Sequence, residues 1–211
     1  MNGKRLIVGE YRTNCYIVWA DCGTDCVVVD PGDNGGEITE EIKALGLTPA
    51  AIFVTHGHFD HFLAVPALQR TWEGLPVYCS GTDCANSEPQ ELYEGVSYPT
   101  LFAMAEKRFI HEGDRVAAAG LTFQILETPG HSPGSVSMIC GDAQFTGDTL
   151  YRGSIGCTDY PGGCMPDMIQ SLKKLALLPG DYRVYPGHDE ETTLARERHS
   201  NPFLHWALGM K

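Results

Sequence analysis

The sequence is poor in positive charge and contains no long apolar run. Its 211 residues carry 15 lysines and arginines against 27 aspartates and glutamates, which gives a formal net charge of −12 at pH 7. A polyanion such as a nucleic acid is repelled by this charge, and we find no basic run that would attract one locally. The N-terminal segment MNGKRLIVGEYRTN lacks the apolar core of a signal peptide, and no stretch approaches the length of a membrane span. We therefore expect a cytoplasmic protein with neither a nucleic-acid nor a membrane partner.

The cysteines match none of the common functional spacings. The chain has eight of them, and three pairs lie close together in the sequence: Cys22 and Cys26, Cys79 and Cys84, and Cys157 and Cys164. These spacings fit neither a CxxC redox pair nor a zinc finger. We interpret the cysteines as reduced structural thiols of a reducing compartment, and a secondary metal or redox role stays open as the alternative.

Strand-like and helix-like segments alternate along the chain. Short β-rich runs predict strands at 16–19, 26–29, 51–54, 75–79, 115–118, 121–126, 135–139, 143–146 and 183–185. Helical spacing of apolar residues predicts helices at 36–45, 62–72, 165–178 and 190–199. Between residues 86 and 104 the pattern is weak, and we expect a loop with a helical piece that acts as a lid. Two β-rich blocks, each followed by helices, indicate an α/β fold with sheets in the middle.

Four titratable residues directly follow the predicted strand 51–54, in the stretch FVTHGHFDHF: His56, His58, Asp60 and His61. Polar side chains at the end of a buried strand are costly unless something binds them. The first three occupy alternate positions, so an extended segment presents them on one side. A turn into a helix would let the side chains of Asp60 and His61 point toward a second position. The pattern indicates two metal ions side by side, each of which needs further ligands.

Three residues further along the chain can supply those ligands. His131 lies in TPGHSPGS, Asp148 in FTGDTL and His188 in VYPGHDE, each at the end of a predicted strand or in the turn that follows it. A glycine precedes each one, which fits a tight turn at the rim of a sheet. The remaining histidines have no such context, and we interpret them as structural or surface residues: His111, His199 and His205.

The motif HxHxDH followed by a distant His, Asp and His resembles the metallo-β-lactamase fold hydrolases, of which TNCYIV and VVVDPG are also typical. The resemblance covers nearly the whole chain. It implies a four-layer αββα sandwich in which two mixed sheets are flanked by helices, with the site at one edge of the sheets. The implied ligands are His56, His58 and His131 for one ion, Asp60, His61 and His188 for the other, and Asp148 as the bridge between them.

Two divalent cations would supply the chemistry of a hydrolase. A water that bridges them loses a proton near neutral pH and becomes a hydroxide nucleophile, and the same ions polarise a substrate carbonyl. Histidine and carboxylate ligands suit zinc, with iron or manganese as further possibilities. Asp60 is expected to orient the hydroxide as well as bind metal, which makes Asp60 and Asp148 the predicted catalytic residues. Asp30 is either a partner of a ligand histidine or a plain turn residue of its DPG sequence.

Within the family, YRGSIGCTDYPGG and HSNPF most resemble the glyoxalase II group, which hydrolyses thioesters such as S-lactoylglutathione. Full-length members carry an additional helical C-terminal domain that supplies most glutathione contacts, whereas this chain stops 23 residues after His188 (211 − 188). We therefore expect a single domain over residues 1–211, similar to the short bacterial members, without that additional domain. Arg152 is a candidate partner for a substrate carboxylate and Tyr151 a candidate pocket residue, with packing and surface charge as the equally open alternative.

Other functions stay open at this point. A persulfide dioxygenase of the same fold uses a single iron and would leave the second set of ligands idle, and a lactonase or other ester hydrolase shares similar ligands. Oxygen-reducing flavodiiron relatives have glutamate where this chain has His58, which favours hydrolysis over redox chemistry. Nucleases of the family need a basic surface that a net charge of −12 does not indicate. A non-catalytic metal-binding protein is the remaining alternative, and the sequence is silent on oligomeric state.

Overall fold

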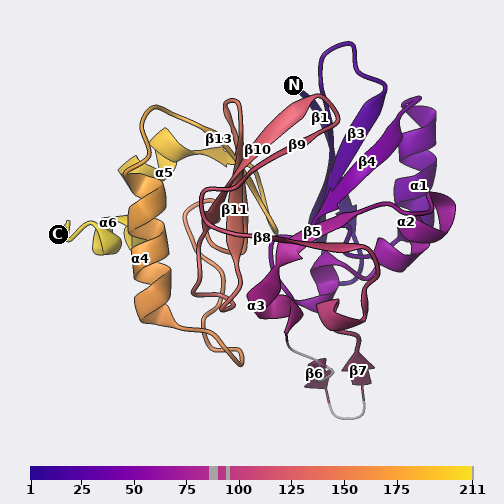
Figure 1. The fold of residues 1–211 in the computed structure, drawn as a ribbon. Coiled ribbons are helices and arrows are strands. Elements are labelled where there is room, and N and C mark those ends of the chain that lie inside the picture. Colours follow the sequence, from indigo (N-terminus) through magenta and orange to yellow (C-terminus); the bar gives the residue numbers. More distant parts are fainter. Residues whose placement is uncertain (86–89, 94–95, 211) are drawn as a thin grey trace.

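Two six-stranded sheets and a small hairpin make up the strands of the protein (Figure 1). The computed structural model describes residues 1–85, 90–93 and 96–210. The first sheet contains β1 (Asn2–Val8), β2 (Thr13–Trp19), β3 (Asp25–Val29), β4 (Thr48–Phe53), β5 (Val77–Ser80) and β8 (Lys107–Ile110), in that spatial order. The second contains β14 (Thr192–Thr193), β13 (Arg183–Pro186), β12 (Ala143–Gly147), β11 (Val136–Cys140), β10 (Leu121–Glu127) and β9 (Arg115–Ala118), again in spatial order. The hairpin consists of β6 (Gln90–Tyr93) and β7 (Val96–Tyr98).

The helices lie on the outer faces of the two sheets, so the molecule has four layers (Figure 1). α1 (Gly35–Ala44) and α2 (Val65–Thr71) pack on the first sheet, α4 (Met165–Ala176) and α5 (Leu194–Ser200) pack on the second, and α6 (Pro202–Ala207) packs against α4 and α5. The short helix α3 (Gly81–Cys84) directly follows β5, and single 3₁₀ turns occupy Phe59–His61 and Leu101–Ala103. The predicted αββα sandwich of two mixed sheets is therefore confirmed.

The buried strands of the first sheet are apolar on both faces because each face meets its own core. In β3, Val28 packs toward the helices, whereas Val27 and Val29 pack toward the second sheet. In β4, Ile52 and Phe53 divide in the same way. This alternation follows from the period of two along a strand, and it explains why the central strands appear in the sequence as continuous apolar runs.

The strand directions bring several loops to one rim of the sandwich. β3 and β4 run parallel in the first sheet, as do β12 and β13 in the second. The loops that follow parallel strands emerge at the same edge. The two sheets are joined there by backbone hydrogen bonds: Val136 N–H donates to Thr55 O over 2.9 Å, and Asn14 N–H donates to Gly187 O over 2.7 Å. The rim is therefore held by contacts between segments far apart in the sequence.

The sequence located most elements but missed the edge strands β1 and β8 and the short helices α3 and α6, among others. All nine predicted strands and all four predicted helices have a counterpart in the structure, with shifted ends. Helix α2 begins at Val65 and not at Phe62, because a 3₁₀ turn at Phe59–His61 precedes it. The edge strands β1 and β8 were missed since each has several exposed residues, and β1 is apolar only over its last three positions. The segment 86–104, predicted as a loop with a helical piece, contains the unpredicted strands β6 and β7 and a 3₁₀ turn at Leu101–Ala103, while its residues 86–89 and 94–95 lie outside the described part.

Two further observations bear on the predictions from composition. Among the residues that the structure describes, no helix combines the length and apolar character that crossing a membrane requires. All eight cysteines are free thiols, and the Sγ atoms of Cys79 and Cys84, both buried, are 2.9 Å apart.

Candidate metal centre

The seven residues predicted as metal ligands converge at the rim of the sandwich. Their donor atoms form three overlapping groups, within each of which all atoms lie within 4.8 Å of one another. The groups are His56, His58 and His131; His56, His61 and Asp148; and Asp60, His61 and His188. They come from the loops after β4, β10, β12 and β13, so both sheets contribute. The first and third groups match the two ligand sets that the family resemblance implies.

In the first group the ring nitrogens of three histidines face one another. His58 Nδ1 lies 2.8 Å from His131 Nε2 and 3.1 Å from His56 Nε2. The other nitrogen of His131, Nδ1, lies 2.6 Å from the backbone carbonyl of Cys157, which can only accept. His131 Nδ1 therefore donates its proton to that carbonyl, and in the neutral ring Nε2 presents a lone pair to the group. Converging lone pairs at this distance favour a shared proton or a cation between them.

The third of these groups, Asp60, His61 and His188, combines two histidines with a carboxylate and is called the second group from here on, because it would hold the second ion. His61 Nε2 lies 3.3 Å from His188 Nε2 and 3.6 Å from Asp60 Oδ2, while His188 Nε2 lies 3.4 Å from the same oxygen. Asp60 Oδ2 also accepts a hydrogen bond from Thr13 Oγ1 over 2.9 Å, which fixes the carboxylate. The oxygen of Asp60 that lies near the two rings is thus also the one anchored to β2.

Asp148 lies between the two groups. Its Oδ2 is 3.3 Å from His131 Nε2, and its Oδ1 is 3.5 Å from His61 Nε2. Among the residues that the structure describes, this buried Oδ1 has no hydrogen-bond partner. An unpaired buried carboxylate oxygen is costly, and a cation beside it would remove the cost. Imidazole nitrogens and carboxylate oxygens are ligands of zinc, iron and manganese, so the donor set fits a divalent metal.

The protonation tendencies of the two groups differ. Burial, followed by the nearby His131, lowers the pKa of His58 to about 4. Burial alone would also lower the pKa of His61, but the carboxylates of Asp60, Asp148 and Asp30 raise it to about 10. Burial would raise the pKa of Asp148, but the surrounding histidines, His61 first, lower it. Without a cation the carboxylates thus hold a proton on His61, which a metal would displace on binding.

Asp30 orients one of these histidines. This residue follows β3 in the left-handed region, at φ 49°, and is buried. Its two oxygens accept hydrogen bonds from the N–H and the hydroxyl of Thr55, each over 2.7 Å, and its Oδ2 lies 3.0 Å from His61 Nδ1. A carboxylate at Nδ1 favours the tautomer that leaves Nε2 free for a metal. Of the two alternatives considered for Asp30, the structure places it as a partner of a histidine.

The two predicted substrate-binding residues lie on the loop after Asp148. The ring of Tyr151 is 6.1 Å from that of His188, nearly perpendicular to it, and burial, followed by Asp148, raises the pKa of the phenol. Arg152 forms an ion pair with Glu190. The guanidinium of Arg152 thus has a carboxylate partner within the protein, that of Glu190.

Sequence reasoning did not single out Tyr160. This residue is 45% exposed, and its ring lies 5.7 Å from that of His58 and 6.1 Å from that of His131. It belongs to the glycine-rich segment between Cys157 and Cys164, whose composition was the only signal in the sequence. Two of the histidines taken as structural or surface residues have other partners: His111 is exposed near Glu127, and His205 bonds to the backbone oxygen of Arg198.

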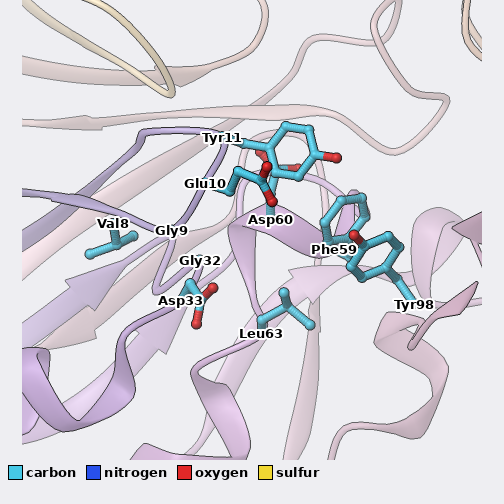
Figure 2. Close-up of a pocket in the computed structure, with 10 residues that line it drawn as sticks. All are labelled: Val8, Gly9, Glu10, Tyr11, Gly32, Asp33, Phe59, Asp60, Leu63 and Tyr98. Atoms are coloured by element: carbon cyan, nitrogen blue, oxygen red, sulfur yellow. The ribbon is translucent and has the colours of Figure 1, made fainter. Parts of the chain in front are cut away.

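A small pocket adjoins the second group of ligands (Figure 2). Its volume is about 70 Å³, and it is lined by Val8, Gly9, Glu10, Tyr11, Gly32, Asp33, Phe59, Asp60, Leu63 and Tyr98. The ring of Phe59 stacks on Tyr98 at 3.7 Å between centroids and meets the edge of Tyr11 at 5.3 Å. The pocket therefore offers an aromatic wall directly beside a candidate metal ligand.

Comparison with known proteins identifies one matching family and several similar proteins. Residues 8–188 match the family model described as the metallo-beta-lactamase superfamily. The chain is 37% identical over 210 residues to the probable metallo-hydrolase YqgX of Bacillus subtilis, which covers 97% of this chain and 98% of the relative. It is 33% identical over 215 residues to the hydroxyacylglutathione hydrolase GloC of Haemophilus influenzae, with 97% and 98% covered.

Solved structures of similar proteins share the whole architecture. The B3 metallo-beta-lactamase BLEG-1 superposes with a TM-score of 0.88 at 33% identity, covering 96% of this chain and 99% of that one. TTHA1623 in a di-iron-bound form superposes with a TM-score of 0.83 at 38% identity, covering 95% of this chain and 99% of that one. ETHE1 from Myxococcus xanthus superposes with a TM-score of 0.80 at 30% identity, covering 99% of this chain and 90% of that one.

Proposed function

This chain belongs to the metallo-beta-lactamase superfamily, and from that premise we propose that it is a dinuclear metal-dependent hydrolase of thioesters, of the glyoxalase II type. The observation that carries the proposal is the convergence of seven donor residues in two groups, with Asp148 between them. A mononuclear enzyme would need only one of the two groups. The similarity to a hydroxyacylglutathione hydrolase over nearly the full length supports the thioester as substrate.

We propose the following ligands. His56, His58 and His131 would hold one ion, Asp60, His61 and His188 would hold the other, and Asp148, which lies between the two groups, would be a ligand of both. Zinc is the proposed metal because histidine and carboxylate donors in compact groups suit it. Iron and manganese accept the same donors, and a relative with 38% identity has been solved in a di-iron form.

When bound, the two cations supply a hydroxide nucleophile near neutral pH and polarise the substrate carbonyl. The residues of the chain position the reactants. Asp60, held by the hydroxyl of Thr13, is ionised because the neighbouring His61 and His188 lower its pKa against the effect of burial. It can therefore accept a hydrogen bond from the attacking water and fix its orientation. Asp30 holds His61 in the tautomer that keeps Nε2 without a proton.

The surroundings of the ligands support a small organic substrate. Tyr160 stands over His58 and His131 with almost half of its surface exposed, and the pocket beside Asp60 has an aromatic wall. We propose that Tyr151 and Arg152 contact the substrate at the other side of the centre. Since Arg152 pairs with the exposed Glu190, an anionic group of the substrate would compete with that carboxylate for the guanidinium.

The proposal is tested by a substrate panel on protein whose metal content has been measured. The panel contains S-2-hydroxyacylglutathione, a thioester of another thiol, a lactone, a β-lactam and glutathione persulfide. We expect the highest kcat/KM for a thioester, on protein that holds two metal ions per chain. A preference for the lactone would indicate a lactonase, and a chain inert toward every member would favour the non-catalytic alternative.

One other activity is favoured by a specific observation. The first group, His56, His58 and His131, would by itself suffice to hold a single ion. A persulfide dioxygenase of this fold with a single iron would leave Asp60, His61 and His188 without a metal. One iron per chain, together with oxygen consumption in the presence of glutathione persulfide, would establish that activity in place of the hydrolase.

A further inference from the structure

Asp83 joins the two loops that carry the first group of histidines. It lies in α3, outside the motifs that resemble the family, and none of the candidate ligand groups contains it. Its carboxylate is half-buried and faces the loop after β4 on one side and the loop after β10 on the other.

Both oxygens of Asp83 accept hydrogen bonds from these loops. Oδ2 accepts from Gly57 N–H over 2.7 Å, and Gly57 stands between the candidate ligands His56 and His58. Oδ1 accepts from Gly134 N–H over 2.6 Å, and Oδ2 accepts also from the hydroxyl of Ser132 over 2.7 Å. Ser132 directly follows His131, so one carboxylate ties together the backbones on which all three histidines are carried.

The two glycines are explained by the same contact. A Cβ atom at Gly57 would lie 2.8 Å from Asp83 Cβ, and one at Gly134 would lie 2.5 Å from Asp83 Oδ1. Both distances are shorter than van der Waals contact permits. The glycines of HGH and HSPG therefore allow both backbones to approach the carboxylate closely.

We propose that Asp83 is a positioning residue, which sets the distance between His58 and His131 and thereby the affinity of the first metal site. Charge-assisted hydrogen bonds to a carboxylate are about twice as strong as neutral ones, and here three of them converge on a single group. The inference rests on the proposed metal centre and adds to it a residue that touches neither metal nor substrate.

The effect should be confined to one site. The second group is held by different residues, because Thr13 anchors Asp60 and Asp30 orients His61. The contacts of Asp83 are made to Gly57, which lies between two histidines of the first group, and to Ser132 and Gly134, which follow the third. A role in positioning therefore predicts a change in the affinity of one site, whereas a general role in folding would affect both sites together.

The test is the variant Asp83→Asn, which keeps the shape but loses the charge and one acceptor. Metal-free protein is titrated with Zn²⁺ against a chromophoric chelator, and with Co²⁺ to record the visible absorption of each site. We expect the affinity of one equivalent to fall about 10- to 100-fold, as is usual for residues that support a metal ligand, while the other equivalent is unchanged. Ser132→Ala, which removes one of the three hydrogen bonds, should give a smaller loss at the same site.

Asp114→Asn is the matched control. Asp114 Oδ2 accepts a backbone N–H of His111 over 2.8 Å in an exposed turn, and its replacement should leave both affinities unchanged. Equal affinities in Asp83→Asn and the unmodified chain would overturn the inference, as would an equal loss at both sites with a matching loss of thermal stability in the metal-free variant. If the unmodified chain binds only one equivalent of metal, the proposed dinuclear function is wrong. The effect of Asp83→Asn is then measured on the metal affinity of the site formed by His56, His58 and His131 alone.

Discussion

Replacing Asp148 with alanine is expected to lower the kcat for thioester hydrolysis by about 10³-fold or more and to release bound metal. Of the carboxylates in the described part of the chain, that of Asp148 is the one that lies within 3.6 Å of both candidate sites, at His131 on one side and His61 on the other. Its removal takes a ligand from each. Metal ions contribute several kcal/mol to the stabilisation of a transition state, and about 4 kcal/mol corresponds to the expected factor.

The measurement combines steady-state kinetics with the metal content of the purified variant. Asp142→Ala is the matched control, because Asp142 precedes β12 as Asp148 follows it, yet it forms only an exposed ion pair with Arg183. That variant should keep its metal and turnover. A folded Asp148→Ala chain with unchanged kcat would show that the bridging position has been assigned to the wrong residue.

Gly187→Ala is expected to have the second-largest effect, although it adds only one methyl group. A Cβ atom at this position would lie 2.2 Å from Asp148 Oδ1 and 2.8 Å from His61 Cε1. The backbone cannot easily move away, since Gly187 donates to Gly147 O over 2.9 Å and accepts from Asn14 N–H over 2.7 Å. The carboxylate and the ring must therefore shift, and a displacement of about 1 Å at a reacting centre can lower the rate about 10²-fold.

The variant should show weakened metal binding in a zinc titration together with the loss of turnover, and a lower melting temperature caused by overpacking. Gly36→Ala serves as the control, because a Cβ at Gly36 meets nothing within 4 Å and the residue lies in the first turn of α1. It should retain activity and affinity. Wild-type turnover in Gly187→Ala would mean that the rim tolerates displacement of Asp148 and His61, contrary to the proposed role of this close packing.

The sequence was most informative where function constrains residue type. Metal ligands are drawn from a few residue types, here His and Asp at close spacing, so HxHxDH and three distant residues could be recognised without coordinates, and the structure places all seven together. Their roles as ligands stay predictions, as do the single-domain organisation over residues 1–211 and the cytoplasmic location. The central strands were predictable for a related reason, because burial on both faces requires a continuous apolar run.

The remaining features depend on contacts that spacing along the chain does not encode. Asp83 lies 26 residues from Gly57 and 51 from Gly134, and only the fold brings it between them. The sequence could not decide whether Asp30 contacts a histidine, because a DPG turn has the same sequence whether or not its carboxylate meets a ring. The edge strand β1 was missed because its side chains are mostly exposed and its pattern is set by pairing with β2.

The central claim, that a pair of metal ions held by these seven residues carries out the chemistry, is tested most directly by removing and restoring the metal. The chain is stripped by exhaustive chelation, its metal content is measured, and turnover of the best thioester is followed as Zn²⁺ is added back. We predict that the stripped chain is inactive and that activity returns as two equivalents bind per chain. Full turnover by the metal-free chain would contradict the proposed mechanism at its foundation.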